Sequence, residues 1–276
     1  MSWFRERRRR NLREAPVPHE WQDIVARNVP HCRYLDALEQ EMLWGDIRIF
    51  LAEKYWEGCG GLTLSDEIRI TVAAQACLLT LCLPEKFYPN VRTILVYPAA
   101  YRVRTRRVGP AGVVTEGRSH RVGEAWQHGS VVLSWQDARA GAANPRDGEN
   151  LVFHEFAHQL DMLDGTPDGT PPLPDEDAYR RWYEVMRDEY DHLVRAVQHG
   201  TRTLLDPYGT QDAAELFAVA TEVFFERPRA LRKRHLALFE LLRDYYRQDP
   251  AQRVDRHPAG ETDEDQADAH HQMEGM

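Results

Sequence analysis

Cysteine and long apolar runs are both scarce in this sequence of 276 residues. The four cysteines are scattered and no two form a CxxC pair, which favours reduced thiols over a disulfide scaffold. The longest apolar stretch, Ile70 to Leu83, is interrupted by polar residues and is too short to cross about 30 Å of hydrocarbon. We therefore expect a buried core helix at this stretch and no membrane span.

Positive charge is also in deficit, with 35 Lys and Arg against 44 Asp and Glu and a net charge of −9. Because affinity for a phosphate backbone depends on clustered cations, this composition predicts no direct binding of nucleic acid.

The N-terminus does not look like an export signal, because no apolar run follows the basic cluster Arg7–Arg10. We expect a cytoplasmic monomer whose hydrophobic content, 42%, is enough to build a sizeable core.

Composition divides the chain into three parts. Residues 1–15 form a basic N-terminal arm, residues 16–255 form the main domain, which is helical to about residue 90, and residues 256–276 form an acidic tail. The tail has too few apolar residues to offset its ordering entropy, so we expect it to be disordered. Within the domain, residue patterns predict strands at 91–97, 113–114 and 130–135, and helices at 150–163, 176–198, 212–225 and 228–247.

The sequence His154-Glu155-Phe156-Ala157-His158 carries the clearest chemical signal. Residues four apart on a helix lie on one face, about 5–6 Å apart at Cβ, so both imidazoles can reach one Zn²⁺. The intervening Glu155 can then take a proton from a metal-bound water, while Phe156 and Ala157 face the core. The spacing predicts a zinc site on a helix.

Two histidines do not complete a catalytic zinc site, which needs a third protein ligand. Asp164 lies six residues after His158, where HExxHxxGxxH/D enzymes place that ligand, but Asp161 stands where those enzymes need Gly. Asp212 ends a GTxD sequence like that of aspartate-ligand zinc proteases, although the residues after it do not match their pattern. Both aspartates are candidates.

Glu215 is the third candidate, on the helix expected from residue 212 onward. Apolar side chains dominate this helix, and a carboxylate among them is costly to bury unless it is paired or bound to a metal. Glu222 lies seven residues further along the same face. One of the two glutamates can bind the metal while the other orients a metal-bound histidine.

Three stretches, Gly129–Trp135, His154–Asp161 and Ala214–Val219, resemble the Mlc titration factor A family of zinc metallopeptidases. The similarity extends from about Trp44 to Arg253. The catalytic part of that family is similar to the protease domain of anthrax lethal factor, and in both a Tyr-Gly pair shortly precedes the Glu ligand. Tyr208-Gly209 matches that pair.

This resemblance implies an α+β, zincin-like metallopeptidase, in which a small mixed sheet packs on the metal-binding helix and the remainder is mainly helical. It implies that His154, His158 and Glu215 hold Zn²⁺. It further implies that Glu155 is the general base and that the hydroxyl of Tyr208 is a hydrogen-bond donor to the transition state.

Two features upstream of the metal helix bear on the site. Some members of the family carry a histidine that can reach the zinc, and its position corresponds here to Thr115, with His120 and His128 nearby but off register. The strand expected at 130–135 precedes the metal helix, and an extended peptide substrate could add to its edge as another strand.

The resemblance implies a peptidase, either aminopeptidase-like or a limited endopeptidase, which also binds a transcriptional repressor in the regulation of sugar uptake. The alternative is a regulatory binding protein that sequesters a transcription factor with little or no hydrolysis, for which the basic arm and acidic tail could serve. The retained Glu155 favours hydrolysis, since binding alone does not require a base. A purely structural zinc site is usually closed by Cys, and none lies near the motif.

Overall fold

A computed structural model describes residues 2–84, 86–99, 107–108, 114–115 and 129–257 of the chain. The first half contains the elements α1 Ser2–Glu14, α2 His19–Asn28, η1 Pro30–Tyr34, α3 Ala37–Glu53, β1 Tyr55–Gly58, α4 Asp66–Leu79, β2 Thr93–Tyr97, β3 Arg107–Val108, β4 Val114–Thr115, β5 Ser130–Ser134 and α6 Trp135–Ala143. The second half contains α7 Leu151–Asp161, η2 Met162–Asp164, α8 Glu176–Gln198, η3 Pro207–Thr210, α9 Ala213–Glu226, α10 Pro228–Arg234, α11 Leu236–Tyr246 and α12 Pro250–Asp255. Helices dominate, and the expected α+β class is confirmed.

The main sheet has three strands in the order β1-β2-β5. Both strand pairs are parallel, so this sheet is not the mixed one expected from the sequence; the antiparallel pair β3–β4 forms a separate two-stranded sheet. Parallel strands need a crossover, and α4 supplies it between β1 and β2. On β2 the residues Ile94 and Val96 are fully buried and alternate with half-buried ones, as a strand of period two requires.

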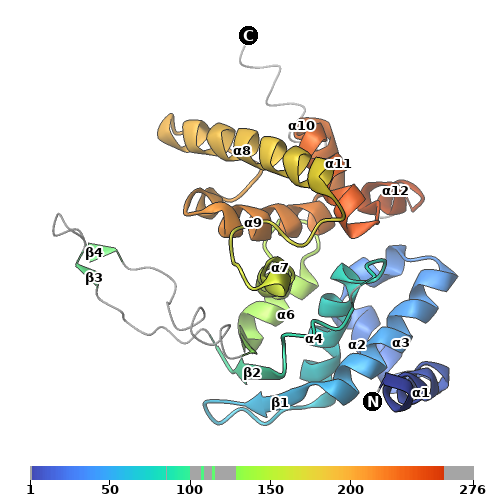
Figure 1. The fold of residues 1–276 in the computed structure, drawn as a ribbon. Helices are drawn as coiled ribbons and strands as arrows, with labels where there is room; N and C mark the ends of the chain where they lie inside the picture. Colours follow the sequence, from blue (N-terminus) through green and yellow to red (C-terminus); the bar gives the residue numbers. More distant parts are fainter. Residues whose placement is uncertain (1, 85, 100–106, 109–113, 116–128, 258–276) are drawn as a thin grey trace.

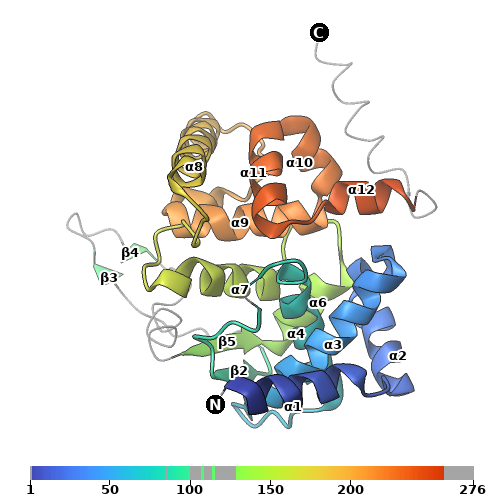
Figure 2. The ribbon, with the colours of Figure 1, turned by 45° about the vertical axis from the view of Figure 1, so that its right-hand side comes forward.

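Helix α7 lies between two layers (Figures 1 and 2). The first layer is the three-stranded sheet with its neighbouring helices, and the second contains α8, α9 and α11. Phe156 points to the first layer, where its ring centroid is 4.7 Å from that of Tyr88. Phe153 points to the second layer, with its ring centroid 5.4 Å from that of Phe225 on α9. Both phenylalanines are fully buried, and so is Ala157, as expected for the core side of this helix.

The two helices that carry the candidate ligands begin at capping side chains. Asn150 accepts the backbone N–H of Phe153 at 3.0 Å, and Asp212 accepts that of Glu215 at 2.9 Å. The first helix passes into η2 and ends at Gly165, whose φ of 97° lies in the left-handed region that favours glycine. The helices expected at 150–163 and 212–225 are thus confirmed to within a few residues.

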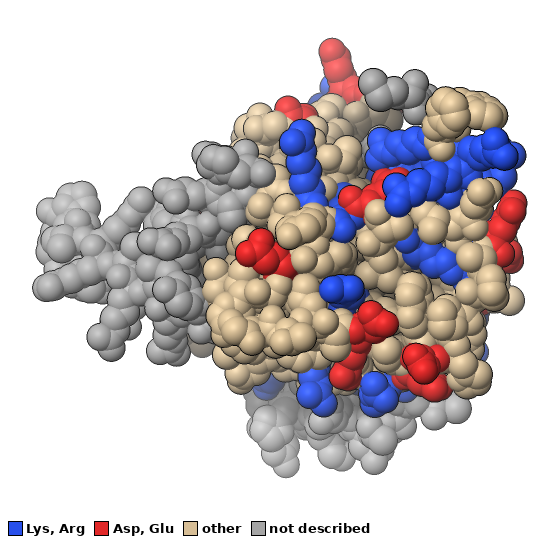
Figure 3. Space-filling model, turned by 90° about the horizontal axis from the view of Figure 1, so that it is seen from below, with Lys and Arg blue, Asp and Glu red and all other residues tan. Residues whose placement is uncertain are grey.

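The arginine-rich N-terminal segment forms α1, which packs on α3. Arg5 and Arg9 both bind Glu53, and the pKa of this carboxyl is held at about 2, chiefly by Arg9. Trp3 and Phe4 remain 61% and 74% exposed. Helix α1 lies at the lower edge of Figure 1, and in Figure 3, which views the molecule from below, Lys and Arg side chains gather on one side of this face.

Other expectations have mixed outcomes. The helix at 176–198 and the strand at 130–135 are confirmed, and the apolar stretch from Ile70 lies in the buried helix α4. The sequence did not indicate β1, and the single helix expected at 228–247 is two helices that meet at His235. Residues 258–276 of the expected acidic tail lie outside the described residues. Within the described chain, no helix is both long and apolar enough to cross a membrane.

Candidate metal centre

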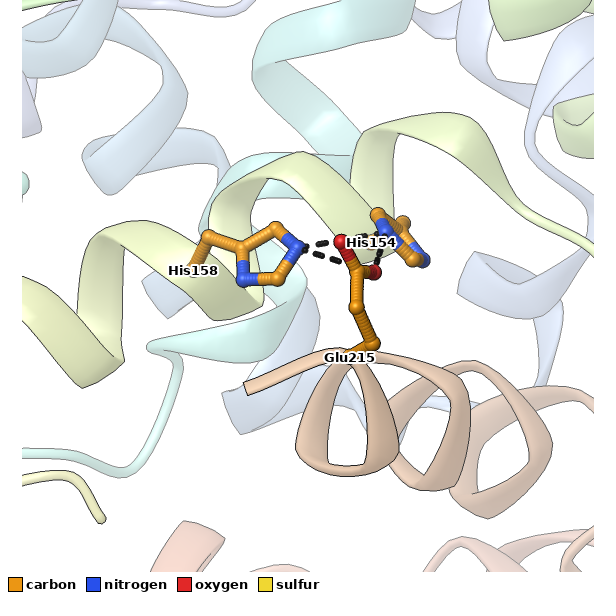
Figure 4. A group of neighbouring side chains, drawn as sticks. All are labelled: His154, His158 and Glu215. Atoms are coloured by element: carbon orange, nitrogen blue, oxygen red, sulfur yellow. Dashed lines mark hydrogen bonds and ion pairs between the residues drawn. The ribbon is translucent and has the colours of Figure 1, made fainter. Parts of the chain in front are cut away.

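Three side chains from two helices converge on one point (Figure 4). His154 and His158 extend from α7, and Glu215 extends from α9 with its carboxylate between the two rings. The Nε2 atoms of the histidines are 3.2 Å apart. Oε2 of Glu215 is 3.0 Å from Nε2 of His154 and 3.5 Å from Nε2 of His158. The group could therefore offer three donor atoms to one ion.

These distances fit a zinc site. Ligands bound about 2.0–2.1 Å from a tetrahedral zinc lie roughly 3.3–3.4 Å from one another, and the three observed separations, 3.0, 3.2 and 3.5 Å, surround that value. Two imidazoles and one carboxylate also form one of the donor sets of catalytic zinc sites, which leave a fourth position for water or substrate. The residues present therefore suit this metal in both geometry and chemistry.

The two aspartates considered as third ligands do not join the group formed by the described residues. Asp164 is exposed in η2, and its Oδ1 accepts the backbone N–H of Thr166. Asp212 caps the helix that carries Glu215. The sequence pattern around Asp212 thus marks the start of the correct helix, but the residue near the histidines is three positions further on.

The charges at the centre create a negative potential at the imidazoles. Burial lowers the pKa of His154, but hydrogen bonds to Glu215 and Glu222 outweigh it and raise that pKa to about 10. Burial raises the pKa of Glu215, yet hydrogen bonds with His154 and His158 hold it at about 2. Burial dominates at His158 and lowers its pKa. Such a negative potential is what a cation site requires.

Carboxylates on α9 also hold the beginning of α7. Glu222 accepts a hydrogen bond from Nδ1 of His154 at 2.8 Å and another from the backbone N–H of Asn150. Glu226, one turn further along, accepts the side-chain N–H of Asn150 at 3.0 Å and the backbone N–H of Gly148 at 3.1 Å. The contact of Glu222 with His154 is the one expected of a glutamate that orients a histidine, and its role at a metal stays a prediction.

Glu155 and Tyr208 both lie near the donor group. Glu155 is 7% exposed, and its negative charge helps to raise the pKa of the adjacent His154. Tyr208 is half-buried in η3, with its ring centroid 6.0 Å from that of His154. The backbone N–H of Tyr208 donates to Asp206 at 2.7 Å, which fixes the turn that carries the ring.

A contact that the sequence did not indicate fixes the loop after α7. Asp161, fully buried at the end of that helix, accepts the backbone N–H of Gly169 at 2.9 Å. The indole N–H of Trp182 donates to the carbonyl of Gly169 at 2.9 Å. Gly169 has a φ of 80°, and an added Cβ would lie 2.3 Å from the carbonyl oxygen of Ala213, so only glycine fits here. Asp161 thus fixes Gly169 at the end of α7, where the glycine lies against Ala213 at the start of α9.

The upstream positions considered for a further ligand are only partly described. Thr115 lies in β4 opposite Arg107. His120 and His128 lie outside the described residues. The part played by this segment therefore stays a prediction.

Comparison with known proteins gives concordant matches. Residues 3–247 match the family described as glucose-regulated metallo-peptidase M90. An uncharacterized protein of Synechocystis sp. is 39% identical over 244 residues, which cover 88% of this chain and 89% of the relative. A Mlc titration factor A of Serratia proteamaculans is 31% identical over 251 residues, 88% of this chain and 92% of the relative. The protein of that name from Yersinia pestis is 29% identical over 253 residues, 89% and 90% of the two chains.

Proposed function

Because the chain belongs to the glucose-regulated metallo-peptidase M90 family, we propose that it is a zinc-dependent peptidase that hydrolyses peptide bonds, as an aminopeptidase or a limited endopeptidase. The observation that carries this proposal is the convergence of His154, His158 and Glu215, with donor atoms 3.0–3.5 Å apart. These three residues would hold the metal. Bound zinc would supply a Lewis acid and lower the pKa of a water molecule toward about 7.

Glu155 is the general base in this proposal. It takes a proton from the attacking water as the C–O bond forms, and it passes a proton to the leaving amine as the C–N bond breaks. The contact between Glu222 and His154 holds the imidazole in one orientation throughout. The burial of Glu155 supports this role, since a carboxylate shielded from bulk water keeps its proton transfers within the site.

Tyr208 donates a hydrogen bond from its hydroxyl to the oxyanion that develops on the scissile carbonyl. Donors fixed before the reaction are effective because they need no reorganisation as charge develops. The short turn η3 supports this role, because Asp206 caps it and Tyr190 on α8 donates its hydroxyl to the carbonyl of Thr210 at 2.8 Å. The ring of Tyr208 is thereby held close to that of His154.

The substrate peptide lies along β5 in this proposal. That strand pairs with β2 on one side, and no described strand pairs with its other side. Helix α7 packs against β5, so an added strand would lie next to the helix that carries the histidines. Backbone hydrogen bonds to an edge strand bind a peptide without regard to its sequence, and side-chain contacts then set the preference.

The substitution Glu155→Gln tests the proposed activity. It removes the base but none of the three donor side chains, so we expect zinc content to be unchanged and hydrolysis of chromogenic amino-acid and peptide substrates to fall by several orders of magnitude. Glu184→Gln, at an exposed position on α8, is the matched control and should keep full activity. Undiminished turnover in Glu155→Gln would disprove the assignment.

As a second function we propose binding to a transcriptional repressor. Two observations favour it: relatives carry the name Mlc titration factor A, and α1 presents exposed Trp3 and Phe4 beside arginines. Among the described residues, Arg7 and Arg10 have no carboxylate partner, which leaves their charge available to an acidic surface.

Gel filtration of the purified chain with a purified sugar-responsive repressor from the same genome tests this second function. We expect co-elution that the Glu155→Gln variant retains and that charge reversal at both Arg7 and Arg10 weakens. Separate elution of the wild-type chain and the repressor would disprove it.

A further inference from the structure

A cavity of about 410 Å³ lies away from the metal centre, between the C-terminal half of α8, the loop at 199–205 and the junction of α10 with α11. None of the three candidate metal ligands lines it. Its volume is within the range of about 300–1,000 Å³ that is typical of small-molecule sites. The cavity is therefore large enough to hold a small organic ligand.

The wall of the cavity is rich in positive charge. Arg195, Arg202 and Arg234 contribute guanidinium groups, and among the described residues of the lining Glu189 is the single acid. Oε2 of Glu189 is already paired with Nδ1 of His235, at 2.7 Å. Neither Arg195 nor Arg202 forms an ion pair with any described residue. Two guanidinium groups thus remain available to a ligand.

The floor of the cavity is apolar. Leu193 is 2% exposed, and Leu204 and Leu205 are 8% and 2% exposed. Leu193 on α8 also packs closely on Gly209, so the floor is held by the same helix that supports η3. A mostly apolar surface with a few fixed polar groups is the usual form of a small-molecule site.

We propose that this cavity binds a small organic dianion, either a phosphate monoester or a dicarboxylate. The planar guanidinium fork matches the oxygens of carboxylate and phosphate groups in a bidentate manner. Arg195 and Arg202 bind the charged groups, and the leucine floor contacts the carbon skeleton. Glu189, the one acid of the described lining, is engaged by His235, whose Nδ1 lies 2.7 Å from its Oε2, and the three arginines of the lining outnumber it.

Calorimetric titration of the full, zinc-loaded chain tests the proposal without reference to peptidase activity. The probes are glycerol 3-phosphate and succinate, with sodium chloride at equal ionic strength as the control for screening. We expect saturable binding of at least one probe, with about one ligand per chain. Binding of the first alone identifies a phosphate ester as the ligand, and binding of the second alone identifies a dicarboxylate. Saturable binding of neither would overturn the proposal.

Paired substitutions locate the site. The double variant Arg195→Gln with Arg202→Gln should bind at least on the order of tenfold more weakly, since each charge-assisted hydrogen bond contributes strongly. Arg180→Gln with Arg187→Gln removes the same charge from exposed positions on α8 that do not line the cavity, and should leave the affinity unchanged. Arg202→Lys keeps the charge but loses the fork, and should give an intermediate loss. If the first double variant binds the probe as tightly as the wild type, the proposal is also overturned. A probe that binds at the metal instead of the cavity would give this result.

Discussion

Glu222 on α9 accepts a hydrogen bond from Nδ1 of His154 on α7, at 2.8 Å. The same helix α9 carries Glu215, whose Oε2 lies 3.0 Å from Nε2 of that imidazole. One helix therefore contacts both nitrogens of His154, one with the proposed ligand and one with an orienting carboxylate. Because Glu222 also accepts the backbone N–H of Asn150, it fixes the beginning of α7 as well as the ring.

This relationship predicts that Glu222→Gln weakens metal binding although Glu222 is not in the donor group. Loss of the carboxylate charge makes His154 a poorer ligand, and such partners of metal-bound histidines typically contribute about 10–100-fold to affinity. Competition with a chromogenic chelator measures the zinc affinity, and Glu184→Gln is the control for an exposed glutamate. A zinc affinity equal to that of the wild type would contradict the proposed role.

Tyr208→Phe removes a single hydroxyl and tests the oxyanion donor. We expect kcat to fall by about 10²–10³, as for other donors of this kind, while KM and zinc content change little. Tyr183→Phe, at a position 66% exposed on α8, should leave kcat unchanged. A rise in KM with kcat unchanged would show that Tyr208 contributes to substrate binding and not to the transition state.

His31 predicts a dependence of stability on pH. Burial, with a smaller effect of Arg33, lowers the pKa of His31 from 6.5 to about 3. As pH falls through 6.5 the unfolded chain takes up this proton and the folded chain does not. The stability present above pH 6.5 is thus lost progressively toward pH 3, and the loss from this group is about 2 kcal/mol at pH 5.

Urea unfolding of wild type and His31→Leu at pH 7.5 and pH 5 measures this effect. The variant should lose less stability on acidification, by roughly that amount. Glu226, whose Oε1 lies 3.5 Å from Nε2 of His31, is present in both chains, so its own titration largely cancels. His19→Leu, where the side chain is 87% exposed, should behave as the wild type. An equal loss in both proteins on acidification would rule out His31 as the cause.

Local sequence patterns predict the helices that carry the site residues, but they do not predict how these helices pack against each other. The four-residue spacing of His154 and His158 needs only one helix, so it could be recognised without a fold. The partner Glu215 comes from a distant helix, and the approach of α9 to α7 depends on packing such as that of Phe153 on Phe225. The spacing of apolar residues along the chain does not indicate that contact. The sequence alone therefore left three candidates for the third ligand, and only the family resemblance favoured Glu215.

The features that the sequence did not indicate also depend on tertiary contacts. The short strand β1 is stabilised by its parallel pairing with β2, which has no local signal. At the break between α10 and α11, His235 contacts Glu189 on α8, a distant residue that the local pattern of one continuous helix does not reveal. The bond from Gly169 to Asp161 joins residues across a loop of irregular structure. Each arises only once distant segments meet.

The zinc content of four purified proteins tests the proposed ligand set most directly. We predict about one zinc per chain in the wild type, in Asp164→Asn and in Asp212→Asn, where Asn can still make the local hydrogen bonds that each aspartate makes. Glu215→Gln should lose most of its zinc, because it removes one of three donors. Full occupancy in Glu215→Gln, together with loss of zinc in either aspartate variant, would contradict the assignment of His154, His158 and Glu215 as the metal centre.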